Sequence, residues 1–330
     1  MRNEFKYIAA LLFVIGTSTA VIVTQTSLLS SGTPAVSQVP SGVDYVAQVD
    51  MSVLQDKETK KLVNTALETA PSYQTSANSL QDALDKIENK SGIDPRDTEE
   101  VVAYGKIPDQ TGSTSYFGLI AHADWSLDTL VESIRKETPQ NLSERTYKGK
   151  TVYVAKSESV VQGQSGQSLW IAEIGTGEYA VGTEKAVKDA IDVSVGDSEP
   201  LSGELKAAYE STRDGYVRFA SRIPESQVPS GSMGMGPDLS AFKNISYVSG
   251  AYYTDSNKVG INLNMETGGT ESAKDVKDAI KGGISLLSTL ASNEKAQETL
   301  DKVKVSRDGK QVTITYEDSV DRLVNLMQSQ

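Results

Sequence analysis

An uncharged, mostly apolar run at residues 7–29 constrains the fold more than any other segment of the chain. A helix needs about 20 apolar residues to cross the ~30 Å hydrocarbon core of a bilayer, and this run is long enough. Arg2 and Lys6 precede it with one acidic residue, so this flank is expected to stay cytoplasmic and the rest of the chain to lie outside. The run predicts an N-terminal transmembrane helix, a single-pass location in the cell membrane, and the lipid bilayer as a partner.

Three interpretations of this run stay open. Its apolar residues up to Ile15, followed by small residues that end at Ala20, are typical of a cleaved signal peptide, and the protein would then be secreted. The apolar character continues to Leu29, which a signal peptide does not need, and this favours a retained anchor. A buried soluble helix is the third interpretation. Because no cysteine follows the run, a lipid-anchored lipoprotein is excluded.

The remaining chain predicts two α+β modules joined by linkers. Residues 30–41 are rich in serine and proline and predict an unpacked linker. The modules are expected at 42–225 and 238–330, separated by a second linker at 226–237, where proline and glycine occur without apolar periodicity. Hydrophobic residues make up 38% of the chain and aromatic residues only 6%, which favours a polar, β-containing fold with modest cores.

Residue periodicity predicts the individual elements. Alternating apolar and polar residues indicate strands, and apolar residues three or four apart indicate helices. The predicted strands are 43–51, 100–107, 115–123, a hairpin at 145–156 that turns at Lys148-Gly149, 169–174, 179–181, 216–221, 245–253, 259–265, 303–306 and 312–316. The predicted helices are 57–69, 77–89, 127–136 with Ser126 as N-cap, 184–193, 201–212, 271–290 with Gly282-Gly283 allowing close packing or a kink, and 318–327.

The two halves of the chain have a similar order of elements. The segments EEVVAYGKI and SYFGLIAHAD, a helix and the hairpin RTYKGKTVYV are matched by ISYVSGAYY, VGINLNM, a helix and KVKVSRDGKQVTI. This order indicates a degenerate internal duplication, and chance similarity of two α+β runs is the alternative. Strands joined mainly by hairpins favour antiparallel sheets with helices packed on one face.

Charge and cysteine content restrict the partners and the sources of stability. The net charge of −12 gives an acidic surface, which repels phosphate backbones and argues against nucleic acid as a partner. The chain has no cysteine, so no disulfide supplements the hydrophobic core.

His122 is the only histidine of the chain, and it lies at the end of a predicted strand beside Asp124 and Trp125. A Ser-His-Asp triad would have to use it, but the sequence has no G-x-S-x-G elbow, so a structural role is expected. One histidine without cysteine supplies no ligand set for zinc, haem or an iron–sulfur cluster. No catalytic residue and no cofactor is therefore predicted.

Carboxylate clusters leave only weak candidates for a cation site with oxygen ligands. One cluster precedes and enters a predicted strand, and the other lies in a predicted turn. The candidate ligands are Asp94, Asp97, Glu99 and Glu100 in the first, and Asp255 and Asn257 in the second. Neither fits the EF-hand pattern, because the glycine and the distal glutamate are missing, so a turn or a solvated face is the main interpretation.

Three segments carry a resemblance to a known group of proteins. The phrases VDYVAQVDMSVL, EYAVGTEKAVKDAID and DGYVRFASRIP resemble uncharacterised cell-surface proteins of archaea and bacteria. Those proteins place one N-terminal anchor or signal before two related α+β modules. The resemblance rests on strand alternation and on a V-G-T-x-x-A-V turn, so it implies architecture and location and supplies no site residue.

These observations predict a membrane-anchored extracytoplasmic protein that acts by binding or assembly and performs no catalysis. Other surface proteins or a second copy of the chain are the expected partners. One alternative is a secreted or surface hydrolase that uses a carboxylate pair or His122. Another is a module that carries a solute or a lipid in an apolar cavity. An exposed apolar patch or a paired edge strand would favour assembly, whereas converging carboxylates in a cleft would favour an enzyme.

Overall fold

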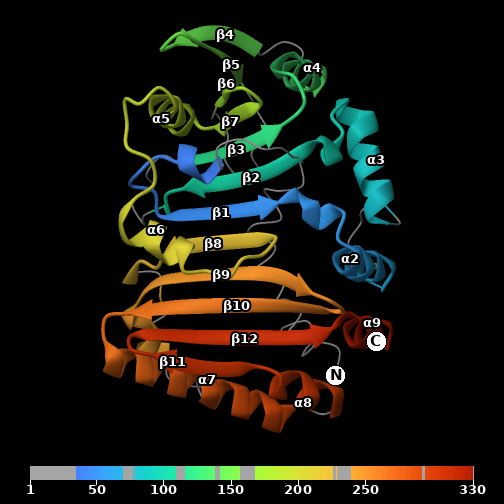
Figure 1. Cartoon of the computed structure of the whole chain (residues 1–330), viewed down its shortest axis with the longest axis vertical. Helices are drawn as coiled ribbons and strands as arrows, with labels where there is room; N and C mark the ends of the chain where they lie inside the picture. Colours follow the sequence, from blue (N-terminus) through green and yellow to red (C-terminus); the bar gives the residue numbers. More distant parts are fainter. Residues whose placement is uncertain are drawn as a thin grey trace. The chain divides into compact units, whose positions relative to one another are not determined.

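The computed structural model describes residues 35–69, 77, 79–108, 116–137, 142–156, 168–225, 228, 239–291 and 294–329. The chain divides into two compact units between Glu204 and Leu205. The described residues up to Glu204 are called the N-terminal unit, and those from Leu205 onward the C-terminal unit. Figure 1 shows the elements of both.

The N-terminal unit is an antiparallel sheet with short helices. Its strands follow the order β1-β2-β3-β7-β6-β5-β4. The strands are β1 (Tyr45–Asp50), β2 (Thr98–Gly105), β3 (Phe117–Ala123), β4 (Leu142–Tyr147), β5 (Lys150–Lys156), β6 (Ser168–Gly175) and β7 (Glu178–Gly182). The helices are η1 (Ala35–Gln38), η2 (Met51–Leu54), α2 (Lys57–Thr69), α3 (Leu80–Ser91), η3 (Pro95–Asp97), α4 (Leu127–Glu137) and α5 (Glu184–Ser194).

The strands of the C-terminal unit also pair antiparallel, in the order β8-β9-β10-β12-β11. The strands are β8 (Val217–Arg222), β9 (Ile245–Asp255), β10 (Lys258–Thr267), β11 (Lys304–Asp308) and β12 (Gln311–Ser319). The helices are α6 (Gly203–Glu210), which begins just before the division, η5 (Leu239–Asn244), α7 (Thr270–Leu290), α8 (Glu294–Asp301) and α9 (Val320–Gln328).

The two units share a connectivity. In each, three strands lie in chain order, and a later hairpin places its second strand beside the third: β7 beside β3, and β12 beside β10. A helix follows that strand at once, α5 in one unit and α9 in the other. The N-terminal unit has the additional hairpin β4-β5 at its edge. By strand order the counterpart of β11-β12 is therefore β6-β7, whereas the sequence comparison matched it with β4-β5.

Several local signals act as the sequence predicts. The backbone N–H of Thr129 donates to Ser126 Oγ at 3.1 Å, which confirms Ser126 as the cap of α4. Lys148 and Gly149 have φ angles of 48° and 77°, so the β4-β5 hairpin turns where it was predicted. The last helix was predicted to begin at residue 318, but it begins at Val320, because Ser319 ends β12 and caps α9 by accepting from the N–H of Arg322.

The predicted fold class is contradicted in its first element. Among the described residues no helix is both long and apolar enough to cross a membrane. The longest of them, α7, carries lysine and aspartate along one side, because it covers a sheet with a single apolar stripe. The apolar run at residues 7–29 lies outside the described residues, and so does the linker predicted at 226–237, apart from Val228.

Part of the segment predicted as an unpacked linker is packed. Ala35 and Val39 are fully buried, with η1 against β2 and β3, and Pro40 forms an antiparallel bridge with Pro200. The free energy gained by burying these apolar side chains against the sheet outweighs the tendency of the neighbouring serines and prolines to form a loop.

Buried apolar side chains hold each helix layer to its sheet. In the N-terminal unit Ala186, Val187 and Ile191 of α5 are fully buried, and the hydroxyl of Tyr104 on β2 donates to the carbonyl oxygen of Ala186 at 2.9 Å. In the C-terminal unit the first half of α7 is buried by a separate cluster. That cluster contains Ile245, Ala273, Val276 and Val312, with Ile280 packed against it.

A buried ion-pair network fixes the end of β12. The Asp318 carboxylate is paired with Lys302 and Arg322, and it accepts from the Tyr316 hydroxyl at 2.9 Å. Burial opposes ionisation of Asp318, but the hydrogen bonds from Lys302, Tyr316 and Arg322 outweigh it and lower the pKa. The charged carboxylate therefore joins β12, α9 and the residue after α8.

Asp318→Asn is expected to lower the free energy of unfolding by about 3 kcal/mol, because it leaves two cations facing a neutral amide. Chemical denaturation of the full chain followed by circular dichroism measures this. The matched control is Glu271→Gln, since Glu271 is exposed at the start of α7 and a surface charge contributes little. Equal stability of the two variants would contradict the role of the network.

Candidate functional site

His122 lies in a row of acidic side chains that crosses four strands. The register places Asp50 on β1 opposite Glu100 on β2, Glu100 opposite His122 on β3, and His122 opposite Glu178 on β7. Residues directly opposite one another in neighbouring strands project from the same face of a sheet. These four residues and Glu99 are called the His122 row.

A β-bulge brings Glu99 into the row. The pairing of β2 with β3 shifts between Thr98 and Glu100, so Glu99 is the extra residue. Its Oε2 lies 3.9 Å from Nδ1 of His122. His122 is only 8% exposed, and the one cation that the row can form is therefore held among carboxylates with little water around it.

The carboxylates of the row are positioned by specific neighbours. Glu100 accepts from the backbone N–H of Ala35 at 2.9 Å and from the side-chain amide of Gln48. Glu178 is 7% exposed and lies over Gly175, where a β-carbon would collide with its carboxylate. A side chain at position 175 would therefore displace the carboxylate of Glu178, a long-range contact that no local sequence signal indicates.

Burial dominates the titration of these acids. Burial raises the pKa of Glu99, Glu100 and Glu178, and the nearby His122 opposes part of the increase in each. Carboxyl groups with raised pKa values hold protons more tightly in the folded state than in the unfolded chain. The contribution of the row to the free energy of unfolding therefore depends on pH, and it is largest when these carboxyl groups are protonated.

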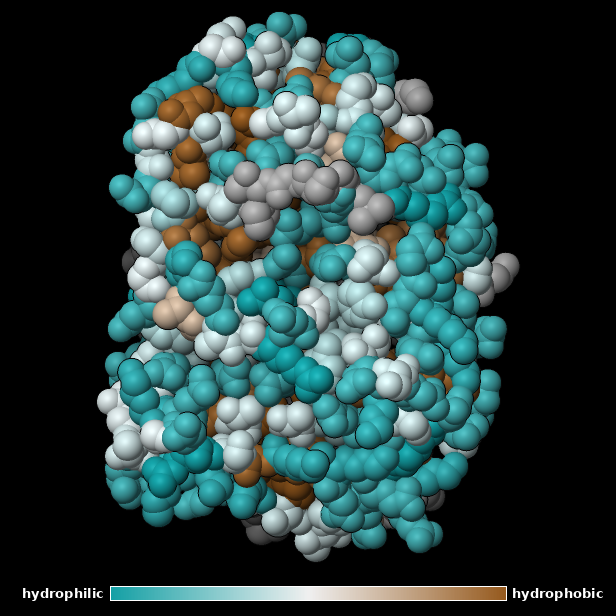
Figure 2. All heavy atoms as spheres, viewed as in Figure 1, coloured by the Kyte–Doolittle hydropathy of each residue, from teal (hydrophilic) through white to brown (hydrophobic). Residues whose placement is uncertain are grey.

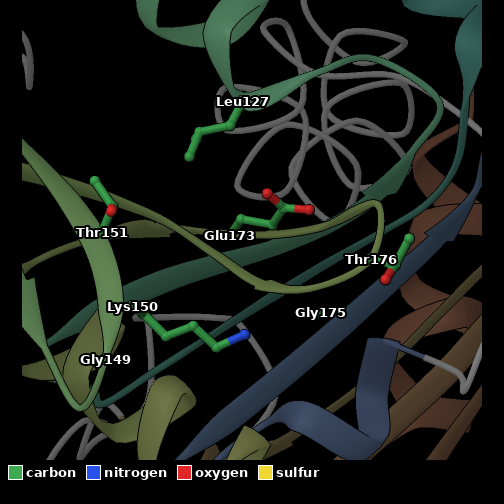
Figure 3. A pocket seen from close by; sticks show the side chains of 7 residues that line it. All are labelled: Leu127, Gly149, Lys150, Thr151, Glu173, Gly175 and Thr176. Carbon is green, nitrogen blue, oxygen red and sulfur yellow. The ribbon is translucent and has the colours of Figure 1, made fainter.

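A shallow, open pocket of about 490 Å³ adjoins the row through Gly175. It is lined by Leu127, Gly149, Lys150, Thr151, Glu173, Gly175 and Thr176. Figure 3 shows the Glu173 carboxylate and the Lys150 ammonium on opposite sides of the β6-β7 turn, and Lys150 Nζ donates to the carbonyl oxygen of Ile174 at 2.9 Å. Leu127 is its one large apolar side chain, so the pocket does not have the continuous apolar wall that a lipid carrier needs.

The predicted cation ligands separate into different roles. Asp94 accepts from the backbone N–H and from Nε of Arg96, at 2.8 and 2.6 Å, and so begins η3. The pKa of Asp97 is raised by burial and then by Asp94 and Asp124. Glu99 faces His122 instead. In the described part of the chain no group of three or more histidine or carboxylate side chains is arranged to hold a metal ion.

The second predicted cluster is a turn. Asp255 and Asn257 lie at the β9-β10 hairpin, where Ser256 has a φ angle of 57°. Asn257 Nδ2 donates to Asp321 Oδ2 at 3.2 Å, and its carbonyl oxygen accepts from the N–H of Val320. These bonds join the hairpin to α9, so the amide and the carbonyl of Asn257 are used for structure.

The row also lacks the parts of a nucleophilic site. Within the described residues Nδ1 of His122 lies 3.9 Å from Oε2 of Glu99, and no hydrogen bond joins His122 to a serine, so no hydroxyl is positioned for activation. Closely spaced buried acids beside one imidazole can take up and release protons. Proton uptake linked to stability is the chemistry that this arrangement favours.

A second feature was not recognised from the sequence. Four large hydrophobic residues are exposed in the described structure, and three of them lie at the end of α7: Leu286 at 40%, Leu287 at 49% and Leu290 at 61%. The fourth is Val195, at 41%. Figure 2 shows a largely hydrophilic face over the C-terminal unit, with a small apolar patch beside α7. These three leucines are called the leucine surface.

The leucine surface carries a usable free energy of binding. Covering about half of each of three leucine side chains contributes roughly 3 kcal/mol, from about 1.5–3 kcal/mol for a complete side chain. The signal in the sequence is the stretch 279–293, which contains five large apolar residues and no acidic one. The sequence does not show where the sheet beneath α7 ends. The exposed stretch therefore has the same residue pattern as the buried part of the helix.

The arrangement defines a two-unit α+β protein whose described strands pair antiparallel. No protein-family model matches the chain. No curated protein matches it either. Solved structures of TP0453 are similar: crystal form IV has 12% identity and a TM-score of 0.45, covering 90% of this chain and 97% of that one. Crystal form I has 13% identity and a TM-score of 0.46, covering 91% and 99%. At these values the likeness carries no argument about fold or function.

The His122 row predicts that acid stabilises the fold relative to a variant without Glu178. Because burial raises the pKa of Glu178 above its ordinary value of 4.5, the stabilising contribution of its protonation is complete below that value. It is lost as the pH rises through the raised pKa of the folded state. The free energy of unfolding of the natural chain, minus that of Glu178→Gln, should therefore increase as the pH falls from neutral toward 4.5.

Urea denaturation at a series of pH values measures this difference. Glu144→Gln is the control, because Glu144 is exposed on the edge strand β4. The difference in free energy of unfolding between the natural chain and Glu144→Gln should vary far less with pH. If the Glu178→Gln and Glu144→Gln curves run parallel, Glu178 does not titrate as its burial requires.

Proposed function

We propose that the chain is an extracytoplasmic protein that acts by binding, without catalysis, and that it attaches to an apolar surface through the leucine surface of α7. The observation that carries the proposal is the exposure of Leu286, Leu287 and Leu290 side by side on one helix end. Contiguous exposed apolar residues mark interaction sites in soluble proteins. The apolar run at residues 7–29, preceded by Arg2 and Lys6, supports export of the chain.

The strength of the contact fits reversible attachment. About 3 kcal/mol corresponds to roughly a 100-fold change in a partition or binding constant, since each 1.4 kcal/mol is tenfold. This is too little for a permanent complex by itself. It gives weak, reversible attachment, because even a single myristoyl chain, which buries more apolar area, binds a membrane only marginally.

The His122 row has a supporting role in this proposal. Its acids lie in the N-terminal unit and the leucine surface lies in the C-terminal unit. The row adjusts the stability of its own sheet to pH, while attachment depends on α7. A variant of the row should therefore leave attachment unchanged at neutral pH.

The triple variant Leu286→Ser, Leu287→Ser and Leu290→Ser is expected to move the protein from the envelope fraction to the soluble fraction of its host. Quantitative immunoblotting after gentle lysis measures the ratio, and about a 100-fold decrease is the upper expectation. Val195→Ser is the matched control, because it removes a single exposed apolar side chain from the other unit. An unchanged ratio for the triple variant would overturn the proposed function.

A further inference from the structure

The occupant of the leucine surface follows from the chemistry around it. We infer that the second half of α7, residues 281–290, inserts its leucine side chains into the interfacial region of a lipid bilayer, lying along the membrane surface. This inference rests on the proposed function and names the partner of the same surface.

The leucine surface continues a stripe that is buried earlier in the helix. Positions seven apart return to nearly the same side of a helix, so Val276, Gly283 and Leu290 share one side. Val276 is fully buried against the sheet, while Leu290 is 61% exposed. The cluster that buries Ala273 and Val276 reaches Ile280, and Ile284 is half-buried, whereas Leu286, Leu287 and Leu290 are exposed. The apolar stripe therefore extends along α7 beyond the part of the helix that packs on the sheet.

The polar side of this half-helix suits a membrane interface. Its polar residues are Ser285, Ser288 and Thr289, and Lys281 is the one charged residue between Asp278 and Glu294. No carboxylate has to be desolvated or brought near anionic headgroups when the leucines enter. In a chain of net charge −12, this stretch combines apolar area with a positive charge.

The size of the leucine surface argues against a second copy or another protein as the occupant. A stable protein–protein interface buries about 1,200–2,000 Å² of total surface, with some 20–30 residues on each side. Three leucines on one helix end supply only a small part of that area. A bilayer has no minimum area, because each apolar side chain that enters adds its own contribution.

The glycine pair gives the half-helix freedom to lie on a surface. A β-carbon at Gly282 or at Gly283 would meet no atom within 4 Å, so close packing does not require glycine at either position. Glycine weakens a helix relative to alanine. The pair lies at the junction between the sheet-packed half of α7 and the exposed half, where bending would turn the leucines toward a membrane plane.

Flotation of the purified full chain with vesicles tests the inference. The natural chain should float with vesicles of phosphatidylcholine mixed with phosphatidylglycerol, and the triple leucine-to-serine variant should lose up to about 100-fold in partitioning. Val195→Ser should float like the natural chain. Leu287→Trp should show a blue-shifted indole emission on vesicle addition, which reports entry of that position. Circular dichroism melts check that each variant is folded.

Lys281→Glu should weaken partitioning onto the mixed anionic vesicles, with little effect on vesicles of phosphatidylcholine alone, because the substitution reverses a charge without changing the leucines. Lys206→Glu on α6 is the control for net charge, since Lys206 is exposed outside α7. An equal loss for both lysine variants would assign the effect to net charge and overturn the placement of Lys281 at the membrane.

The outcomes separate this inference from the proposed function. Because residues 7–29 can bind vesicles by themselves, vesicle binding that the triple variant retains overturns the lipid inference when Leu287→Trp also shows no shift in emission. The lipid inference is also overturned if the natural chain does not bind vesicles but its envelope association depends on the leucines. That result would assign the leucine surface to a protein partner. A leucine-dependent dimer seen by light scattering would assign the surface to a second copy. If neither association depends on the leucines, the inference and the proposed function both fail.

Discussion

The apolar contact between α7 and the C-terminal sheet fixes the position of every other feature of that helix. Ala273 and Val276 are fully buried with Ile245 and Val312 in one cluster, and this contact sets which side of the helix faces inward. The same stripe then extends beyond the cluster to the leucine surface. Helix stability in proteins comes mostly from such packing, so the buried half supports an exposed half that gains little from its own contacts.

The N-terminal unit meets a different constraint, the burial of acids. Glu99, Glu100 and Glu178 surround the only histidine at low exposure, and their raised pKa values are the consequence. Buried polar networks cost stability when they are incompletely paired. The raised pKa values limit that cost under mildly acidic conditions. This sheet is thus expected to tolerate acid better than a sheet of the same size with exposed carboxylates.

Local signals in the sequence predicted local structure well. Ser126 caps α4, and Lys148-Gly149 makes the hairpin turn, because each depends on a few adjacent residues. Long-range features were beyond such signals. The row exists through a four-strand register with a bulge at Glu99, and no spacing in the sequence encodes that alignment. The leucine surface depends on where the sheet ends beneath α7, and periodicity alone does not show this.

The contact between residues 281–290 and lipid is measured directly by hydrogen–deuterium exchange. The full chain is compared with and without vesicles of phosphatidylcholine and phosphatidylglycerol. Amides of residues 281–290 are expected to exchange more slowly on vesicles, while those of residues 270–278, already packed on the sheet, keep their rates. Unchanged exchange in residues 281–290 on bound vesicles, or protection confined to other elements, would contradict this contact.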